Sequence, residues 1–308
     1  MNMEQSSAAL CQELEHNETA DYRRLQIGKW LAQVGDPRSG VSVEDGLPDI
    51  EWLPIASEGM VKITRFWRPD TPDEEAKVIP MGNFRVQPFY IAKYLVTYVQ
   101  YQSFVEAEDG YDNAAWWQGM PKAYQRQELA EQRTKLDNHP RDSLSWYQSI
   151  AFARWLNDRM QGFELPQLFG KDTMRVGDNA QVRLPTEWEW QWAAQNGAEV
   201  RLYPWAEANN RYANTIESGL KQTTAVGMYP HGAAACGALD MAGNLMEWCL
   251  NDKIDLEVRG VTSSATKALR GGDWGYGTEN AICAYCDDED PSRIDPLNGF
   301  RLIIGRKL

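Results

Sequence analysis

The segment Gly237-Ala238-Leu239-Asp240-Met241-Ala242-Gly243-Asn244-Leu245-Met246-Glu247-Trp248 is the most informative stretch of this sequence. Two carboxylates, Asp240 and Glu247, flank a Gly-Asn turn. With the backbone carbonyls between them, they could hold a hard cation such as calcium, which prefers oxygen ligands. The alternative is that Asp240 caps a turn and Glu247 pairs with an arginine, because calcium sites usually contain more carboxylates. From these residues alone, both interpretations are open.

Short strands and loops are predicted around this segment, from Gly197 to the end of the chain. Apolar residues there occur in short runs separated by turn residues, and the last run, Asn298 to Gly305, is typical of a terminal strand. Upstream, helices are predicted wherever a Ser or Thr is followed three residues later by Gln or Glu, because the two side chains cap a helix start. These pairs are Thr97 with Gln100, Ser145 with Gln148, and Thr186 with Glu189. Few helices, short and mostly antiparallel strands and long ordered loops together indicate an α+β fold.

The first 47 residues have a different character. Residues 1 to 20 are polar and are predicted to be mobile, whereas Tyr22 to Val34 carry apolar residues at helical spacing and are predicted to form one short helix. A turn-rich stretch follows this helix. The main domain is therefore predicted to cover residues 48–308.

Composition narrows the class of protein. The chain has 308 residues, of which 43% are hydrophobic, and its formal charge of -13 argues against binding to nucleic acid, whose backbone is also negative. No stretch reads as a signal peptide or could span a bilayer, so no membrane insertion and a cytoplasmic location are expected. Five cysteines without a framework spacing are expected to remain reduced. No oligomeric state follows from these features.

A succession of sequence blocks resembles the formylglycine-generating (sulfatase-modifying factor) family. The blocks are FYIAKYLVT at 89–97, SW at 145–146, RLPTEWEW at 183–190, the segment 237–248, RGGDW at 270–274 and GFR at 299–301. The resemblance covers roughly residues 50 to 308 and implies the enlarged C-type lectin fold of that family. It also implies a structural calcium site, with ligands at the side chains of Asp240 and Glu247 and at the carbonyls of Gly243 and Leu245.

The family's catalytic groups are not found at their expected positions. The resemblance implies that two thiolates following the RGG-Ser-Trp block hold copper(I), a soft ion that prefers sulfur. By spacing from Trp274 these positions are Tyr276 and Ala281, and Asp273 replaces the family's usual serine. The three histidines lie too far apart for the iron site of the family's sulfoxide-forming branch. We therefore expect neither copper nor iron and no catalysis.

Residues 270–301 have the texture of a variable binding region, in which family framework residues bracket side chains of unrelated chemistry. This arrangement resembles the variable proteins that retroelements diversify, so the region is predicted to bind a protein ligand. Tyr276 is the expected aromatic anchor. The acidic run from Asp287 to Asp290 is expected to favour a basic partner. The predicted ligand-binding residues are Asp273, Trp274, Gly275, Tyr276, Ile282, Tyr285, Cys286, Asp287, Asp288, Asp295, Pro296 and Asn298.

Two other functions remain open. One is an oxidase of the formylglycine-generating type that uses the Cys-x-x-Cys pair, Cys283 and Cys286, in an unusual geometry. The other is a structural or regulatory module without a diversified surface. The binding protein is favoured over both, because the scaffold is intact while the catalytic thiols expected at 276 and 281 are missing.

Overall fold

Helices occupy a small part of this chain. The computed structural model describes residues 6–67, 77–168, 173–206 and 212–308. Its α-helices are α1 (Ser7–Leu14), α2 (Asp21–Val34), α3 (Tyr98–Glu106), α4 (Trp146–Arg159) and α5 (Glu187–Ala194). Single 3-10 turns are η1 (Ala114–Trp117), η2 (Lys122–Tyr124), η3 (Ile216–Ser218), η4 (Pro230–Gly232) and η5 (Thr278–Asn280).

The three predicted capping pairs are confirmed. Thr97, Ser145 and Thr186 each accept a hydrogen bond from the backbone N–H three residues later, and each partner side chain returns a bond to the cap residue's N–H. These reciprocal bonds satisfy amides that have no partner inside the helix. They start α3, α4 and α5 at the predicted residues.

The strands form two small sheets and three hairpins. Sheet order is β3-β6-β14-β9 in one four-stranded sheet and β12-β11-β10-β13 in the other. Strands β1 with β2, β4 with β5, and β7 with β8 form separate antiparallel pairs. The bounds are β1 (Val43–Glu44), β2 (Leu47–Pro48), β3 (Trp52–Ile55), β4 (Gly59–Trp67), β5 (Lys77–Val86), β6 (Phe89–Ala92), β7 (Glu164–Leu165), β8 (Met174–Arg175), β9 (Ala180–Arg183), β10 (Met246–Asp252), β11 (Lys267–Arg270), β12 (Cys286–Glu289), β13 (Asn298–Gly299) and β14 (Ile303–Arg306).

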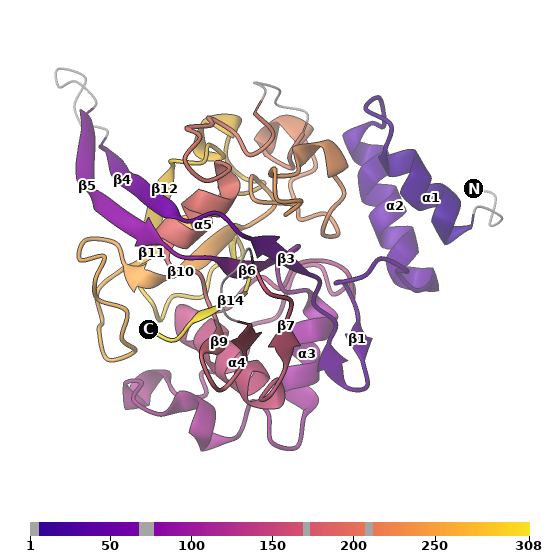
Figure 1. Ribbon diagram of the computed structural model, residues 1–308. Helices are drawn as coiled ribbons and strands as arrows, with labels where there is room; N and C mark the ends of the chain where they lie inside the picture. Colours follow the sequence, from indigo (N-terminus) through magenta and orange to yellow (C-terminus); the bar gives the residue numbers. More distant parts are fainter. Residues whose placement is uncertain (1–5, 68–76, 169–172, 207–211) are drawn as a thin grey trace.

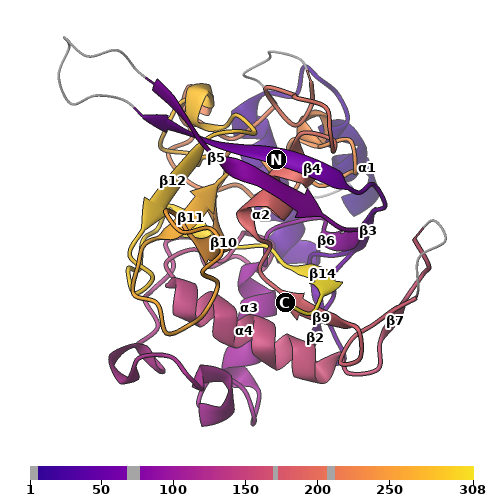
Figure 2. The same cartoon turned by 60° about the vertical axis from the view of Figure 1, so that its left-hand side comes forward.

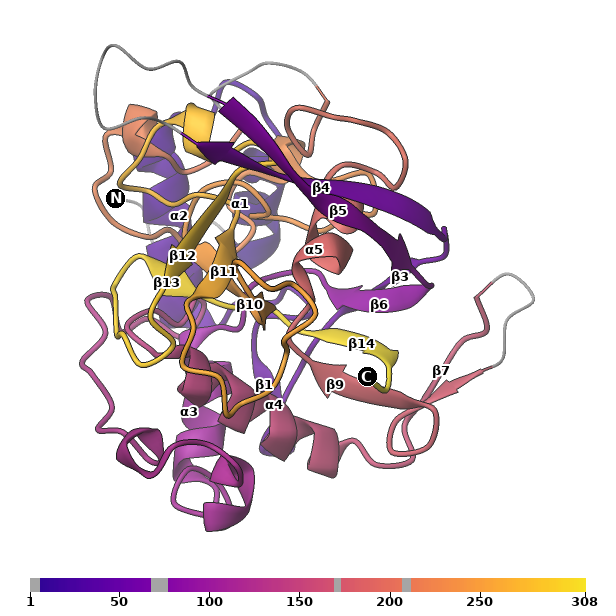
Figure 3. The same ribbon diagram turned by 90° about the vertical axis from the view of Figure 1, so that its left-hand side faces the viewer.

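Antiparallel pairing dominates, as predicted. Among the described strand pairs only β10 with β13 is parallel. With few helices, short strands and long loops, the chain has the predicted α+β fold of the C-type lectin type. Helices α3 and α4 lie on one side of the β3-β6-β14-β9 sheet, and the β4–β5 hairpin extends away on the other side (Figure 1). Seen from the side, α5 lies between that hairpin and the sheet of β10 and β11 (Figure 3).

Aromatic side chains fill the core. In the larger cluster, Trp146 and Trp155 of α4 are buried with Phe300, and Phe152 packs edge-on against Phe300 with ring centroids 5.5 Å apart. A second cluster buries Trp190 and Trp192 of α5 against β4 and β10. Burial of large apolar side chains is the main stabilising term of such a domain. The framework around segment 270–301 therefore rests on both clusters.

The N-terminal segment is more ordered than predicted. Residues 1–20 were expected to be mobile, but Ser7–Leu14 form α1, which pairs with α2 beside the main body (Figures 1 and 2). Leu10 and Leu14 are buried against Ala225 and Met228. The periodicity of a short polar segment does not predict this contact, because its partners lie more than 200 residues away in the chain. The expectation of mobility is wrong for Ser7–Leu14, and residues 1–5 lie outside the part of the chain that the structure describes.

The predicted domain boundary at residue 47 falls inside the β1–β2 hairpin. Contacts cross it, since Thr97 donates to the carbonyl of Val41 at 2.9 Å and Gln100 donates to that of Gly40 at 3.1 Å. Residues just before the boundary thus pack on α3. The division into 1–47 and 48–308 stays a prediction.

Candidate functional site

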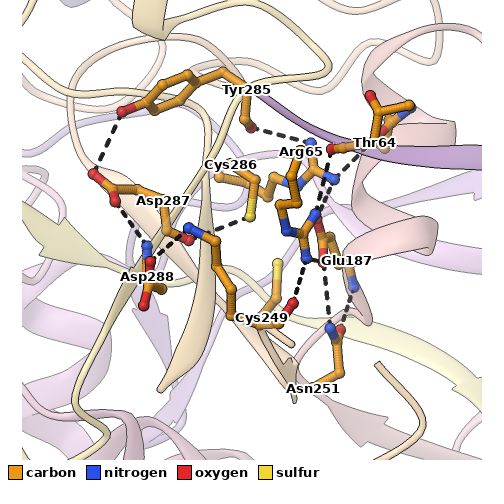
Figure 4. A network of polar contacts seen from close by, with 12 residues as sticks. Thr64, Arg65, Glu187, Cys249, Asn251, Tyr285, Cys286, Asp287 and Asp288 are labelled. Carbon is orange, nitrogen blue, oxygen red and sulfur yellow. Dashed lines mark hydrogen bonds and ion pairs between the residues drawn. The ribbon is translucent and has the colours of Figure 1, made fainter. Parts of the chain in front are cut away.

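A buried network of charged side chains contacts segment 270–301 from the protein interior (Figure 4). Glu187, at the start of α5, is buried and forms ion pairs with Arg65 of β4 and Arg270 of β11. Burial would raise the pKa of the Glu187 carboxyl, but the two guanidinium groups hold it below its usual range. Arg270 also donates to the carbonyls of Cys283 and Tyr285, at 3.1 and 3.0 Å. These bonds hold the backbone of the segment whatever its side chains are.

A second buried arginine holds the far end of the segment. Arg301 makes a two-pronged ion pair with Glu247, with Nε–Oε2 and Nη2–Oε1 distances of 2.6 and 2.7 Å. It also donates to the carbonyls of Ala92 and Leu239, at 3.1 and 2.9 Å. Charged hydrogen bonds of this two-pronged kind are strong and directional. The RGG and GFR blocks therefore carry the anchors that the sequence led us to expect.

Both carboxylates of the predicted calcium site have partners within the protein. Glu247 already accepts from Arg301 on both oxygens and from the Trp190 indole at 2.8 Å, and a guanidinium at this distance opposes a second cation. Asp240 accepts from the Gly227 N–H at 2.6 Å. Among the described residues, no group of three or more His, Cys, Asp or Glu is arranged to hold a metal. The contacts match the alternative interpretation, an arginine partner for Glu247.

Gly243 and Leu245, the other two predicted ligands, have packing roles in this arrangement. Gly243 adopts a φ of +76°, and a Cβ there would lie 2.6 Å from the carbonyl oxygen of Asn214. Only glycine tolerates both conditions. Leu245 is fully buried in a cluster with Tyr94 and Leu95.

The two positions of the family's catalytic thiols have separate environments. The side chain of Tyr276 is 54% exposed, and its carbonyl accepts from the N–H of Ile216 at 3.0 Å. Ala281 is buried in an apolar cluster with Trp205 and Ala213. Neither carries a sulfur, so a copper(I) site cannot be built at these positions.

The Cys-x-x-Cys pair lies in surroundings that disfavour thiolates. Cys283 is buried and Cys286 is half-buried, and all five cysteines of the chain are free thiols. Burial raises the pKa of both Cys283 and Cys286 to about 12. At neutral pH both are thiols, whereas metal binding and nucleophilic attack require the thiolate.

Asp273 is the most unusual member of the predicted ligand face. Its side chain is 2% exposed, and Oδ1 accepts from the Gly275 N–H at 2.7 Å. Burial, reinforced by the neighbouring carboxylates of Asp295 and Asp287, raises its pKa to about 6. A carboxylic acid held in a buried position next to a candidate binding surface is a mark of functional sites.

The predicted ligand residues do not all reach the surface. Tyr276 is exposed, and the half-buried members are Trp274, Gly275, Ile282, Tyr285, Cys286, Asp287, Asp288, Asp295 and Pro296. Asn298 is 4% exposed, because it pairs with Met246 as part of β13. Asn298 and Asp273 are thus corrections to the predicted face, since both lie beneath it.

The acidic run has a structural role that its sequence did not reveal. Residues 286–289 form β12, an edge strand whose only neighbour in the described part of the chain is β11. The N–H groups of Asp288 and Asp290 bond to the carboxylates of Asp287 and Glu289, each at 2.9 Å. Asp288 also pairs with Lys253 at 2.5 Å. Carboxylates that occupy edge amides discourage pairing with another strand.

Two exposed apolar residues that contact segment 270–301 were not predicted from the sequence. Ile216 and Leu202 are each 55% exposed. Ile216 is bonded through its backbone to Tyr276, and the Leu202 carbonyl accepts from the Cys283 N–H at 2.8 Å. Both lie far from the segment in sequence, so only the tertiary contacts bring them to it.

Comparisons with known proteins agree on the fold. The structure is similar to that of Treponema denticola variable protein 1, with a TM-score of 0.53 and 19% identity over 82% of this chain and 94% of that one. It is also similar to PvdO from Pseudomonas aeruginosa, with a TM-score of 0.54 and 20% identity over 87% and 98%. At this level of identity the likeness concerns the fold alone. No described helix is long and apolar enough to cross a membrane.

Curated relatives include enzymes. The chain is 26% identical over 247 residues to the formylglycine-generating enzyme of Streptomyces coelicolor, which covers 63% of this chain and 70% of that protein. It is 24% identical over 304 residues to hercynine oxygenase of Mycolicibacterium smegmatis, covering 86% of this chain and 64% of that protein. The sulfatase-modifying factor enzyme 1-like domain matches residues 56–306, which is most of the chain. The chain therefore belongs to the sulfatase-modifying factor family, whose members include formylglycine-generating enzymes.

Proposed function

We propose that this protein is a non-catalytic binding protein that recognises a protein ligand with the surface around segment 270–301. One observation carries the proposal: the segment's backbone is fixed by Arg270 and Arg301, while Tyr276 stays exposed at a position where the family has a catalytic thiol. A scaffold that fixes backbone but not side chains suits recognition rather than chemistry. The similarity of the fold to a variable protein supports the same assignment.

The surface has an apolar centre and an acidic margin. Tyr276 lies beside Ile216, and the exposed Glu279 and the carboxylate of Glu217 lie near them, the latter accepting from the Thr278 N–H at 3.1 Å. Aromatic anchors surrounded by charge are typical of binding hot spots. The preferred ligand is therefore a protein with an apolar patch and a basic rim.

Diversification by a retroelement is the finer part of the proposal. It requires a near-copy of the gene's 3' end, differing mainly at template adenines, beside a reverse transcriptase gene. Sequencing the locus tests this directly. A locus without either feature would leave a binding protein with one fixed specificity and would end the diversification proposal.

The proposal predicts that the side chains of the binding surface contribute little to stability, whereas the buried arginine anchors contribute much. Substituting Tyr276, Ile282 or Pro296 singly by alanine should change the free energy of unfolding by less than about 1 kcal/mol. Replacing Arg270 by alanine should cost about 3–5 kcal/mol, because Glu187 loses a buried counter-charge. Urea unfolding followed by circular dichroism measures both. If the first group proves as costly as the second, these side chains belong to the core and the proposed binding surface is wrong.

An oxidase remains the second candidate, because relatives of this chain are enzymes. It would have to use Cys283 and Cys286. Incubation with copper(I), oxygen and a cysteine-containing sulfatase peptide tests it, with mass spectrometry to detect the aldehyde. Aldehyde formation that disappears in the Cys283→Ser variant would replace the binding proposal with catalysis.

A further inference from the structure

A polar cavity of about 240 Å³ borders the proposed binding surface. Its lining residues come from three parts of the chain that are distant in sequence. They are Arg133, Thr134, Asp142, Lys221, Gln222, Thr223, Trp274 and Pro296. Drug-sized ligand sites usually measure about 300–1,000 Å³, so this cavity suits a single side chain or a very small molecule.

Two cations stand at its rim without a counter-ion. Arg133 and Lys221 are exposed, and neither belongs to an ion pair within the described residues. The Arg133 guanidinium lies over the Trp274 ring, 5.4 Å from its centroid, which holds the group in place. Lys221 occupies a left-handed turn with a φ of +54°, a conformation that lysine rarely adopts. The chain as a whole has a net charge of -13, so a cavity bordered by two cations without ion pairs is locally positive on a negatively charged protein.

The buried carboxyl of Asp142 partly offsets this positive charge. Asp142 is 2% exposed, and its Oδ1 has no hydrogen-bond partner. The other charged groups near it are Arg141, which stacks on Tyr101, and Arg133. His139 is buried behind Thr223, and burial lowers its pKa to about 3, so it carries no charge. With two rim cations and one carboxylate, the lining has a formal charge of +1, which matches a monoanion better than a dianion such as phosphate.

We propose that this cavity, which Trp274 helps to line, is a binding site for a carboxylate group held by Arg133 and Lys221. The inference does not depend on the proposed protein ligand. The same chemistry could come from an Asp or Glu side chain of a bound protein or from a small free carboxylic acid. Thr134, Gln222 and Thr223 supply further polar groups around it.

The site carries a built-in pH dependence. Burial raises the pKa of Asp142 to about 6, although Ser143, Arg141 and Arg133 lower it in part. Protonation below this value removes the one negative charge of the lining. Carboxylate affinity should therefore rise several-fold as the pH falls from about 7.5 to about 5.5, where acetate is still mostly ionised.

The test is a titration of the full chain with sodium acetate, followed by nuclear magnetic resonance of backbone amides 221–223 in buffer without other carboxylates. Saturable shifts are expected. Arg133→Gln and Lys221→Gln should each weaken binding at least about tenfold, whereas Lys122→Gln, an exposed lysine outside the cavity, should not. Asp142→Asn should bind acetate more tightly than the natural chain at about pH 7.5 and should lose the pH dependence.

Three results would overturn the proposal. They are no saturable shift at any accessible acetate concentration, equal binding by Lys122→Gln and Lys221→Gln, or tighter binding of methylammonium or inorganic phosphate than of acetate. A blocked tripeptide with a central glutamate, compared with its glutamine analogue, assigns the source. Preference for the glutamate peptide over acetate supports a carboxylate from a protein, and preference for acetate supports a free acid.

Discussion

Asp273 offers the sharpest test of how segment 270–301 is built. Its carboxyl replaces the serine of the family pattern, is 2% exposed and has a pKa raised from 3.8 to about 6. A group whose acid form is favoured in the folded state destabilises that state once it ionises. We expect the variant Asp273→Asn, which cannot ionise but can still accept from the Gly275 N–H, to be more stable than the natural chain at neutral pH.

The size of the effect follows from the pKa difference. One unit corresponds to about 1.4 kcal/mol, so linkage gives a stabilisation below about 1 kcal/mol at pH 4, about 2 kcal/mol at pH 5 and about 3 kcal/mol above pH 7. The sign is that of a raised carboxyl: the folded state binds more protons than the unfolded state between the two pKa values, and stability is lost as the pH rises through that window. Residual solvent contact makes the figure an upper bound.

Urea unfolding of both chains between pH 5 and pH 7.5, monitored by circular dichroism, measures this difference. Asp178→Asn, at an exposed turn residue, is the control for the loss of one negative charge from an acidic protein. A difference that does not change with pH, or a variant that is less stable above pH 7, would refute the reasoning. The first would mean that Asp273 is solvated, and the second that its carboxylate makes a stabilising contact.

Three other outcomes are expected. Glu247→Gln should lower the free energy of unfolding by about 3–5 kcal/mol in the same assay, because the buried Arg301 loses its counter-charge; a loss below 1 kcal/mol would contradict this. Arg24→Met should speed hydrogen exchange in α1 and leave exchange in α4 unchanged, because Arg24 donates to the carbonyls of Leu14 and Met228 at 3.0 and 2.7 Å. Unaltered exchange in α1 would show that apolar packing alone holds the α1–α2 helix pair in place. Cys283 and Cys286 should resist iodoacetamide at neutral pH until the chain unfolds, because burial raises both thiol pKa values to about 12; rapid labelling of the native chain, read by mass spectrometry, would revive the oxidase alternative.

Local signals in the chain predicted much of the fold. The starts of α3, α4 and α5 follow from cap pairs that act within four residues. The RGG and GFR blocks indicated anchors around segment 270–301, and their arginines are those anchors. The replacement of both catalytic thiols can be read directly from Tyr276 and Ala281.

Other features depend on partners that the linear chain does not display. Arg301 pairs with Glu247, which lies 54 residues earlier in the chain. Glu247 is also one of the two carboxylates that the predicted calcium site requires. Helix α1 is ordered because Leu10 and Leu14 find Ala225 and Met228 across the chain. A short polar segment carries no local sign of such a surface.

The amino-acid sequence thus determined the helix starts, the family framework and the absence of the family's thiols, because these depend on residue identity and short spacing. Only the tertiary structure decided which side chains of segment 270–301 are exposed. Asp273 and Asn298 are buried, whereas Ile216 joins Tyr276 at the surface, because burial depends on packing between segments distant in sequence. The cavity between Arg133, Lys221 and Trp274 has the same origin.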